Sequence, residues 1–335
     1  MAIFEEVLFV KKPYRILLFL VVCVALYGGL LCASAADTTP KSVYTVDEPY
    51  QYPILPGTAE WRALNTLEEK IRACHVDEEL LASMTTPALL ETVLTYPLLV
   101  NIYAFNSIES GMKNVSMYFP GISLLAARED VNGCLIEYAQ AAAQRREETS
   151  TISKLNMETL SRYLGVELSE IEDVNSNDTS SVAASTTYVY TPKGSRVQVL
   201  ANLTWANMPC TYDEALEMEQ VYLGMYSSMA KISGPNSTFN CHSYAWYSNE
   251  PSTNKYWIDS PYVPVYMSDG SYKKMSSAAV TYKAYWPDGD HSGIVGSASG
   301  VGGNPTIVSK WGCLGVYWHS LLDCPYYGGV TYWAP

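Results

Sequence analysis

The chain has 335 residues, of which 48% are hydrophobic and only 16% are charged. Its 34 acidic residues outnumber the 21 basic ones and give a formal net charge of −13, which is the wrong sign for a nucleic-acid partner. A chain of this length and composition can bury a sizeable core, and its length fits roughly two domains.

The N-terminal segment has the pattern of an export signal. Basic residues between positions 11 and 15 precede an apolar run (Ile16–Leu31), and small residues follow at 33–36. This order is typical of a cleaved signal peptide. Because the apolar run approaches the roughly 20 residues that span a bilayer, an uncleaved membrane anchor is the alternative. We predict a signal peptide at 1–36, an extended segment at 37–57, and a protein that is secreted or held at the cell surface.

Residues 58–169 have the pattern of a helical domain. Thr86 followed by Pro87 is a favourable helix start, since threonine caps the first turn and proline fits its first position. Apolar residues recur three and four positions apart in 134–146 and 152–163, which is the period of amphipathic helices. We therefore expect short helices packed on one another.

A polar stretch at 170–187, rich in Ser, Asn and Thr, is predicted to be a linker. Beyond it, two short runs around a Pro-Lys-Gly turn at 188–200 indicate a hairpin, and a helix is expected over 211–231. The remaining residues are rich in Tyr, Trp, Gly and Ser and are expected to form strands. The predicted fold class is α+β, with an all-helical domain followed by a helix-plus-antiparallel-sheet domain (188–335), each folding separately.

Six cysteines follow the predicted signal peptide. They are Cys74, Cys134, Cys210, Cys241, Cys313 and Cys324. None belongs to a Cys-x-x-Cys pair, so structural zinc is not supported, and we expect no metal or other cofactor. Disulfides are allowed outside the cell, and Cys313 and Cys324 are close enough in sequence to close a short loop. The connectivity stays open, because reserving Cys241 as a free thiol leaves an odd number.

Cys241 is the candidate nucleophile. A Gly-Pro-Asn-Ser turn at 234–237 leads into a segment whose composition suits a helix after Asn240. Cys241 would then open a helix, where free amide groups stabilise the thiolate, the reactive form of cysteine. His242 follows directly, but on a helix it points about 100° away from its neighbour and is a poor base for this sulfur.

His291 is the better candidate for the base. It lies in Gly-Asp-His-Ser-Gly-Ile-Val (289–295), a turn entering a strand whose small residues allow a helix to approach. The next predicted strand (305–308) runs into Ser-Lys-Trp-Gly (309–312), which places Ser309 to orient the imidazole. Nucleophile, base and orienting group are the general elements of a catalytic triad.

These motifs carry a resemblance across residues 233–312. A cysteine that opens a helix, an Asp-His-Ser-Gly-Ile-Val strand and a strand closing in Ser-Lys-Trp-Gly resemble the papain-like cysteine peptidases and amidases. Bacterial members include cell-wall enzymes of the NlpC and cysteine-histidine amidohydrolase types. Longer strings at 240–247, 309–312 and 324–326 also resemble secreted proteins of Gram-positive bacteria, which indicates a bacterial, extracellular setting.

The resemblance implies a papain-like fold for 188–335 and a role for each site residue. These are nucleophile (Cys241), base (His291), orienting group (Ser309, with His319 as the alternative), oxyanion-hole amide (Asn236, in place of the family's glutamine) and shielding aromatic (Trp311).

Together these features predict a secreted thiol hydrolase that cleaves an amide bond, in a peptidoglycan stem peptide or in protein, through an acyl-enzyme. The expected partners are a peptide or peptidoglycan substrate and the cell wall. Two alternatives remain: a transglutaminase-like acyl transferase that uses the same Cys-His pair, and a catalytically inactive binding module on the same fold. The helical region is either a pro-region that covers the substrate groove or an independent interaction domain.

Overall fold

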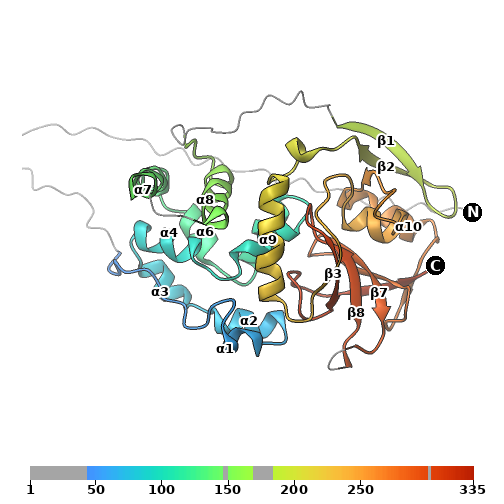
Figure 1. Ribbon diagram of the computed structural model, residues 1–335, viewed down its shortest axis with the longest axis horizontal. Coiled ribbons are helices and arrows are strands. Elements are labelled where there is room, and N and C mark those ends of the chain that lie inside the picture. Colours follow the sequence, from blue (N-terminus) through green and yellow to red (C-terminus); the bar gives the residue numbers. More distant parts are fainter. Residues whose placement is uncertain (1–43, 146–149, 169–183, 301–302) are drawn as a thin grey trace, which may run out of the picture. The chain divides into compact units, whose positions relative to one another are not determined.

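The computed structural model describes residues 44–145, 150–168, 184–300 and 303–335 (Figure 1). The predicted signal peptide and most of the predicted linker lie outside these residues. Within the described ranges, no helix is long and apolar enough to cross a bilayer. Residues 44–57 contain neither a helix nor a regular strand, and an isolated bridge joins Val46 to Met84.

The N-terminal region is helical, as predicted. Its elements are α1 (Ala59–Arg62), α2 (Leu67–Ala73), α3 (Glu78–Ser83), α4 (Thr86–Leu94), the 3-10 helix η1 (Leu99–Ala104), α5 (Ile108–Ser116), α6 (Gly121–Ala126), α7 (Val131–Arg145) and α8 (Thr151–Tyr163). The two predicted amphipathic segments form α7 and α8. At α2, Thr66 and Glu69 form a reciprocal capping box. Thr86 is the first residue of α4 rather than its cap, and its hydroxyl instead donates to Asp130 at 2.7 Å.

The C-terminal region is built on an antiparallel sheet of seven strands in the order β3-β9-β8-β7-β6-β10-β5. These strands are β3 (Ala230–Ser233), β5 (Lys273–Met275), β6 (Lys283–Trp286), β7 (His291–Ser297), β8 (Thr306–Lys310), β9 (Val316–Ser320) and β10 (Thr331–Ala334). A second sheet contains the predicted hairpin, β1 (Ser185–Tyr190) and β2 (Arg196–Ala201), with β4 (Tyr256–Trp257). Helices in the N-terminal part and antiparallel sheets after them confirm the α+β class.

Helix α9 (Tyr212–Met225) starts where predicted but ends well before residue 231. Thr211 caps it, in a capping box with Glu214. The chain turns extended at Tyr226, whose side chain is fully buried and whose hydroxyl donates to Asn101 at 2.8 Å. This tertiary packing overrides the helical pattern of the next residues, and the chain enters the sheet as β3.

The helical region and the sheet share one hydrophobic core. Figure 1 shows α9 between the helices and the seven-stranded sheet. The hydroxyl of Tyr222, on α9, donates to the Val100 carbonyl, and that of Tyr326, near the C-terminus, donates to the Ala104 carbonyl at 2.7 Å. This shared core favours a single cooperative folding unit. The sequence-based expectation that the two regions fold separately stays a prediction.

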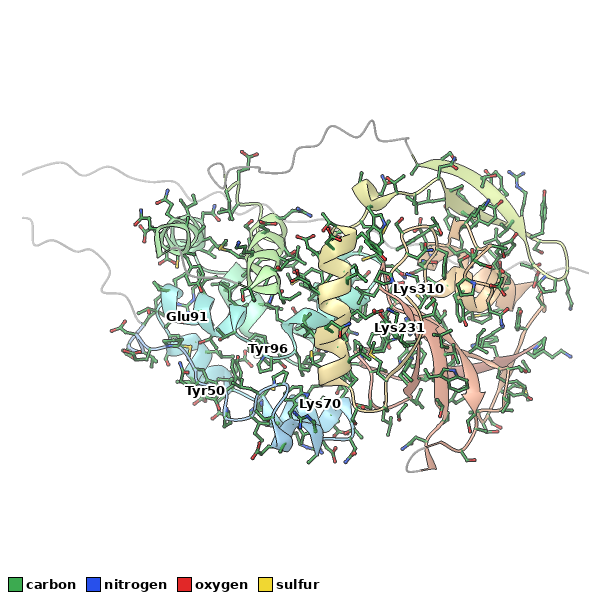
Figure 2. The ribbon with its side chains drawn as sticks, in the orientation of Figure 1. Tyr50, Lys70, Glu91, Tyr96, Lys231 and Lys310 are labelled. Carbon is green, nitrogen blue, oxygen red and sulfur yellow. The ribbon has the colours of Figure 1, made fainter. Side chains whose placement is uncertain are left out.

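A buried ion pair joins the same two regions. Lys70, on α2, lies with its ammonium nitrogen 2.5 Å from a carboxylate oxygen of Asp323, and both side chains are 1% exposed or less. The ammonium also donates to the Leu64 carbonyl at 2.8 Å, and the carboxylate accepts from the Ser228 amide at 3.2 Å. Figure 2 labels Lys70 within the helical region. The pair therefore has hydrogen-bond partners on both sides, as buried charges require.

Candidate active site

Cys241 opens a short helical segment, as predicted. Asn240 acts as its cap: the side-chain oxygen accepts from the Ser243 amide at 3.0 Å, and the carbonyl accepts from the Tyr244 amide at 2.9 Å. The Asn240 amide donates to the Ile258 carbonyl at 2.7 Å, which fixes the cap from outside the segment. Residues Ser243–Tyr247 continue as a π-helical turn. Wide turns of this type occur frequently at functional sites.

The Cys241 sulfur is only 1% exposed and lies against Asn106, from the helical region. The Asn106 amide nitrogen is 3.4 Å from the sulfur, and its oxygen is 3.6 Å away. The same amide donates to the Asp290 carbonyl at 3.3 Å, and the sulfur lies 3.9 Å from that carbonyl. Asn106 is itself partly exposed, so the sulfur lies one side chain below the surface.

His242 is bound to a carboxylate. Its Nε2 lies 2.9 Å from Asp290 and 3.2 Å from the Ser260 hydroxyl, and its Nδ1 lies 2.8 Å from the Ser292 hydroxyl. The Trp246 indole donates to the same Ser292 oxygen at 2.8 Å. With Nε2–H donating to the carboxylate, His242 is held in one orientation.

The surroundings of His242 favour its charged form. Burial disfavours the imidazolium, but the charge of a Cys241 thiolate and the hydrogen bond and charge of Asp290 outweigh burial and raise the pKa of His242 to about 10. Asp290 itself adopts a left-handed conformation, with φ of 47°. At neutral pH the site therefore contains a buried imidazolium beside Cys241.

His291 has the opposite character. It is fully buried, and neither ring nitrogen has a hydrogen-bond partner among the described residues. Its ring stacks on Tyr326, with centroids 3.4 Å apart and planes 9° apart, and lies 5.1 Å from Trp286. Burial lowers the pKa of His291 well below its usual 6.5, and the nearby His319 and His242 add to this effect. His291 is thus neutral and a weak proton acceptor. Neither of its ring nitrogens is hydrogen-bonded to the Cys241 sulfur, so its role as the base stays a prediction.

Ser309 is bound to His319 rather than to His291. His319 donates from Nδ1 to the Ser320 carbonyl at 2.9 Å, so its Nε2 accepts from the Ser309 hydroxyl at 2.7 Å. The indole of Trp311, fully buried, donates to the same hydroxyl at 3.1 Å. Burial lowers the pKa of His319 to about 4, so this imidazole is also neutral. Neither Ser309 nor His319 forms a hydrogen bond with His291, so neither orients it in the described structure.

Asn236 does not contact the Cys241 sulfur. Its side-chain oxygen accepts from the backbone amide and the hydroxyl of Thr238, both at 2.7 Å. Its backbone carbonyl accepts at 2.9 Å from Lys310, a fully buried lysine at the end of β8 that also donates to the Gly312 carbonyl at 2.7 Å (Figure 2). The amide at the sulfur is that of Asn106, which sequence reasoning missed.

A hollow of about 400 Å³ lies at the boundary of the helical region and the C-terminal segment, and neither Cys241 nor His291 lines it. It is lined by Trp286 and Tyr326, the two rings that pack on this imidazole, and by residues of α2 and the C-terminal segment. The described residues contain no group of three or more His, Cys, Asp or Glu side chains that could hold a metal ion.

The chain matches no protein-family model, no curated protein and no solved structure. The functional interpretation therefore rests on the geometry around Cys241.

Replacing Asp290 with asparagine should lower the pKa of His242, because the carboxylate that accepts from its ring is removed. A histidine whose folded-state pKa is raised to about 10 stabilises the protein fully below about pH 6.5 and loses this contribution as the pH rises through about 10. In urea unfolding, Asp290→Asn should therefore be less stable than the wild type near pH 6. The difference should shrink toward pH 10, and each unit of pKa is worth about 1.4 kcal/mol.

Asp288→Asn is the matched control, since Asp288 is exposed and two positions away. It should leave the pH dependence unchanged. A pH-independent difference between Asp290→Asn and the wild type would mean that this carboxylate does not hold a charged His242.

Proposed function

We propose that the protein is a secreted thiol hydrolase that cleaves an amide bond of a peptide or peptidoglycan substrate, with Cys241 as nucleophile. The observation that carries this proposal is Cys241 at the start of a helical segment, beside a buried His242 that Asp290 holds at 2.9 Å and whose pKa is raised to about 10. Strongly perturbed pKa values of this kind cluster at functional sites.

In the proposed mechanism, the Cys241 thiol transfers its proton to His242, and the resulting imidazolium stabilises the thiolate. The sulfur then attacks the substrate carbonyl carbon, and the carbonyl electron pair moves to oxygen. When the C–N bond breaks, the His242 imidazolium gives its proton to the leaving amine. Water then hydrolyses the thioester, with His242 as base. Asp290 holds the His242 ring and balances its charge.

A papain-like arrangement of the C-terminal region is part of this proposal. It is supported by Cys241 at the start of a helical segment, His291 at the first position of β7, and Ser309 on the adjacent strand β8. The proposed site differs from the family's pattern, because the Asp290 carboxylate is hydrogen-bonded to His242 and the Ser309 hydroxyl to His319.

One observation favours the non-catalytic alternative, a binding module. Cys241 and His242 are 1% exposed or less and Asn106 lies on the sulfur, so a substrate reaches the sulfur only if Asn106 moves aside. Acyl transfer to an amine shares every step up to the thioester and differs only in the acceptor. Formation of a thioester on Cys241 therefore separates both enzymatic functions from the binding module.

We further propose that the Asn106 amide stabilises the oxyanion in this site, since it is the side-chain amide that lies on the sulfur. Asn106→Ala should slow acylation of the protein by p-nitrophenyl acetate by roughly 100-fold, because losing one oxyanion donor costs about 10²–10³ in rate. The release of p-nitrophenol measures this rate.

Alkylation by iodoacetamide forms no oxyanion. It therefore shows whether Asn106 donates a hydrogen bond to the oxyanion or only blocks access to the thiol. It should proceed at least as fast in Asn106→Ala as in the wild type, since the side chain above the sulfur is gone. If acylation is also as fast as in the wild type, Asn106 only covers the thiol and has no role in catalysis.

A further inference from the structure

Cys210 and Cys313 are neighbours in space, although they are 103 positions apart in the chain. Their sulfur atoms lie 3.2 Å apart, and both side chains are 5% exposed or less. The spacing of Cys313 and Cys324 also allows a short loop, but the Cys324 thiol donates to the Leu321 carbonyl at 3.4 Å instead. We propose that Cys210 and Cys313 form a disulfide bond in the exported protein.

The backbone on both sides of this pair is well anchored. Cys210 directly precedes Thr211, the cap of α9. Cys313 lies in the turn between β8 and β9, and its carbonyl accepts from the Asn236 amide at 3.0 Å. A disulfide has an S–S distance of about 2.0 Å, so the two sulfurs need to approach by only about 1 Å, which side-chain rotation can supply.

Cys313 is the better attacking sulfur of the two. The hydrogen bond from Cys210 lowers the pKa of Cys313, burial opposes this effect, and the charge of nearby Lys310 adds to it. Thiolates, rather than thiols, attack disulfides.

The oxidant is an external disulfide, RSSR, that reaches the pair after the two cysteines meet and before the surrounding core closes over them. The Cys313 thiolate attacks one of its sulfurs and releases RS⁻. Cys210 then loses its proton and attacks the Cys313 sulfur of the mixed disulfide, releasing the second RS⁻. Two protein thiols are oxidised and one RSSR is reduced to two RSH. Once the chain has folded, the bond is shielded from reductants by its burial.

This bond would restrict the motion of the turn between β8 and β9, which packs beside the candidate active site. Gly312, next to Cys313, has φ of 46°, and a Cβ there would lie 2.4 Å from the Phe105 carbonyl oxygen. The turn thus packs directly on the segment that carries Asn106. The proposal shares with the proposed function only the export of the protein, and its test is independent of catalysis because it depends on the Cys210–Cys313 contact.

The test is a peptide map of the full chain refolded with oxidised glutathione. Free thiols are alkylated under denaturing conditions, and the digest is examined by mass spectrometry. We expect a linked peptide pair that contains Cys210 and Cys313. A Cys313–Cys324 link, or alkylation of both Cys210 and Cys313, would overturn the proposal.

Thermal unfolding provides a second readout. The wild type refolded with oxidised glutathione should melt roughly 5–10 °C above the same protein refolded in reductant. Cys324→Ser should keep this difference, and Cys210→Ser should abolish it. A difference that persists in Cys210→Ser would also contradict the proposal, since another bond would then cause it.

Discussion

Replacing Lys70 with methionine is expected to lower the free energy of unfolding by about 3–5 kcal/mol. The substitution keeps much of the side-chain volume but leaves the Asp323 carboxylate buried without its cation, and this carboxylate is only 1% exposed. Urea unfolding near neutral pH measures the loss. Because the pair joins α2 to the C-terminal segment, both regions should unfold in a single transition.

Two variants control this measurement. Arg72→Met breaks an ion pair with Glu68 whose side chains are 64% and 72% exposed, and it should cost less than about 1 kcal/mol. The double variant Lys70→Met/Asp323→Leu removes both buried charges and should recover much of the stability. If Lys70→Met costs no more than Arg72→Met, the buried pair does not join the regions as described.

The largest effect on activity is expected for Cys241→Ala. Without its nucleophile, the protein should lose acylation by p-nitrophenyl acetate, and turnover of peptidoglycan fragments or casein, by at least about 1000-fold. Cys134→Ser is the control, because Cys134 is the cysteine that remains partly exposed among the described residues and could react nonspecifically. Equal rates in Cys241→Ala and the wild type would rule out Cys241 as the nucleophile.

Two histidines separate the proposed roles within this assay. His242→Ala should remove the proton acceptor, whose pKa is about 10, and lower the rate at every pH. His291→Ala should lower the rate less, because its ring is not hydrogen-bonded to the sulfur. Identical profiles for both variants would contradict the division of roles.

Some features of the site could be predicted because they depend on neighbouring residues. The start of the helical segment at Cys241 depends on the Asn240 cap, whose hydrogen bonds reach only three or four positions along the chain. The entry of His291 into a strand depends on the turn and small residues beside it. Such patterns can be seen in a single sequence.

Other features could not be predicted, because distant segments create them. Asn106 meets Cys241 from 135 positions away, and nothing in its own neighbourhood marks it. Asp290 lies within the Asp-His-Ser-Gly-Ile-Val motif, but its left-handed backbone and its pairing with His242 appear only in the folded chain. The sequence pattern predicts that Ser309 orients His291, whereas the adjacent strand β9 supplies His319 as its partner.

The most direct test of the central claim is the identity of the acylated residue. The full chain is reacted with p-nitrophenyl acetate, quenched in acid, digested and mapped by mass spectrometry. We predict one acetyl group as a thioester on Cys241, formed more slowly in Asn106→Ala and absent in Cys241→Ala. Acetylation confined to lysines or to other cysteines, with Cys241 unmodified, would contradict the account and favour a binding module.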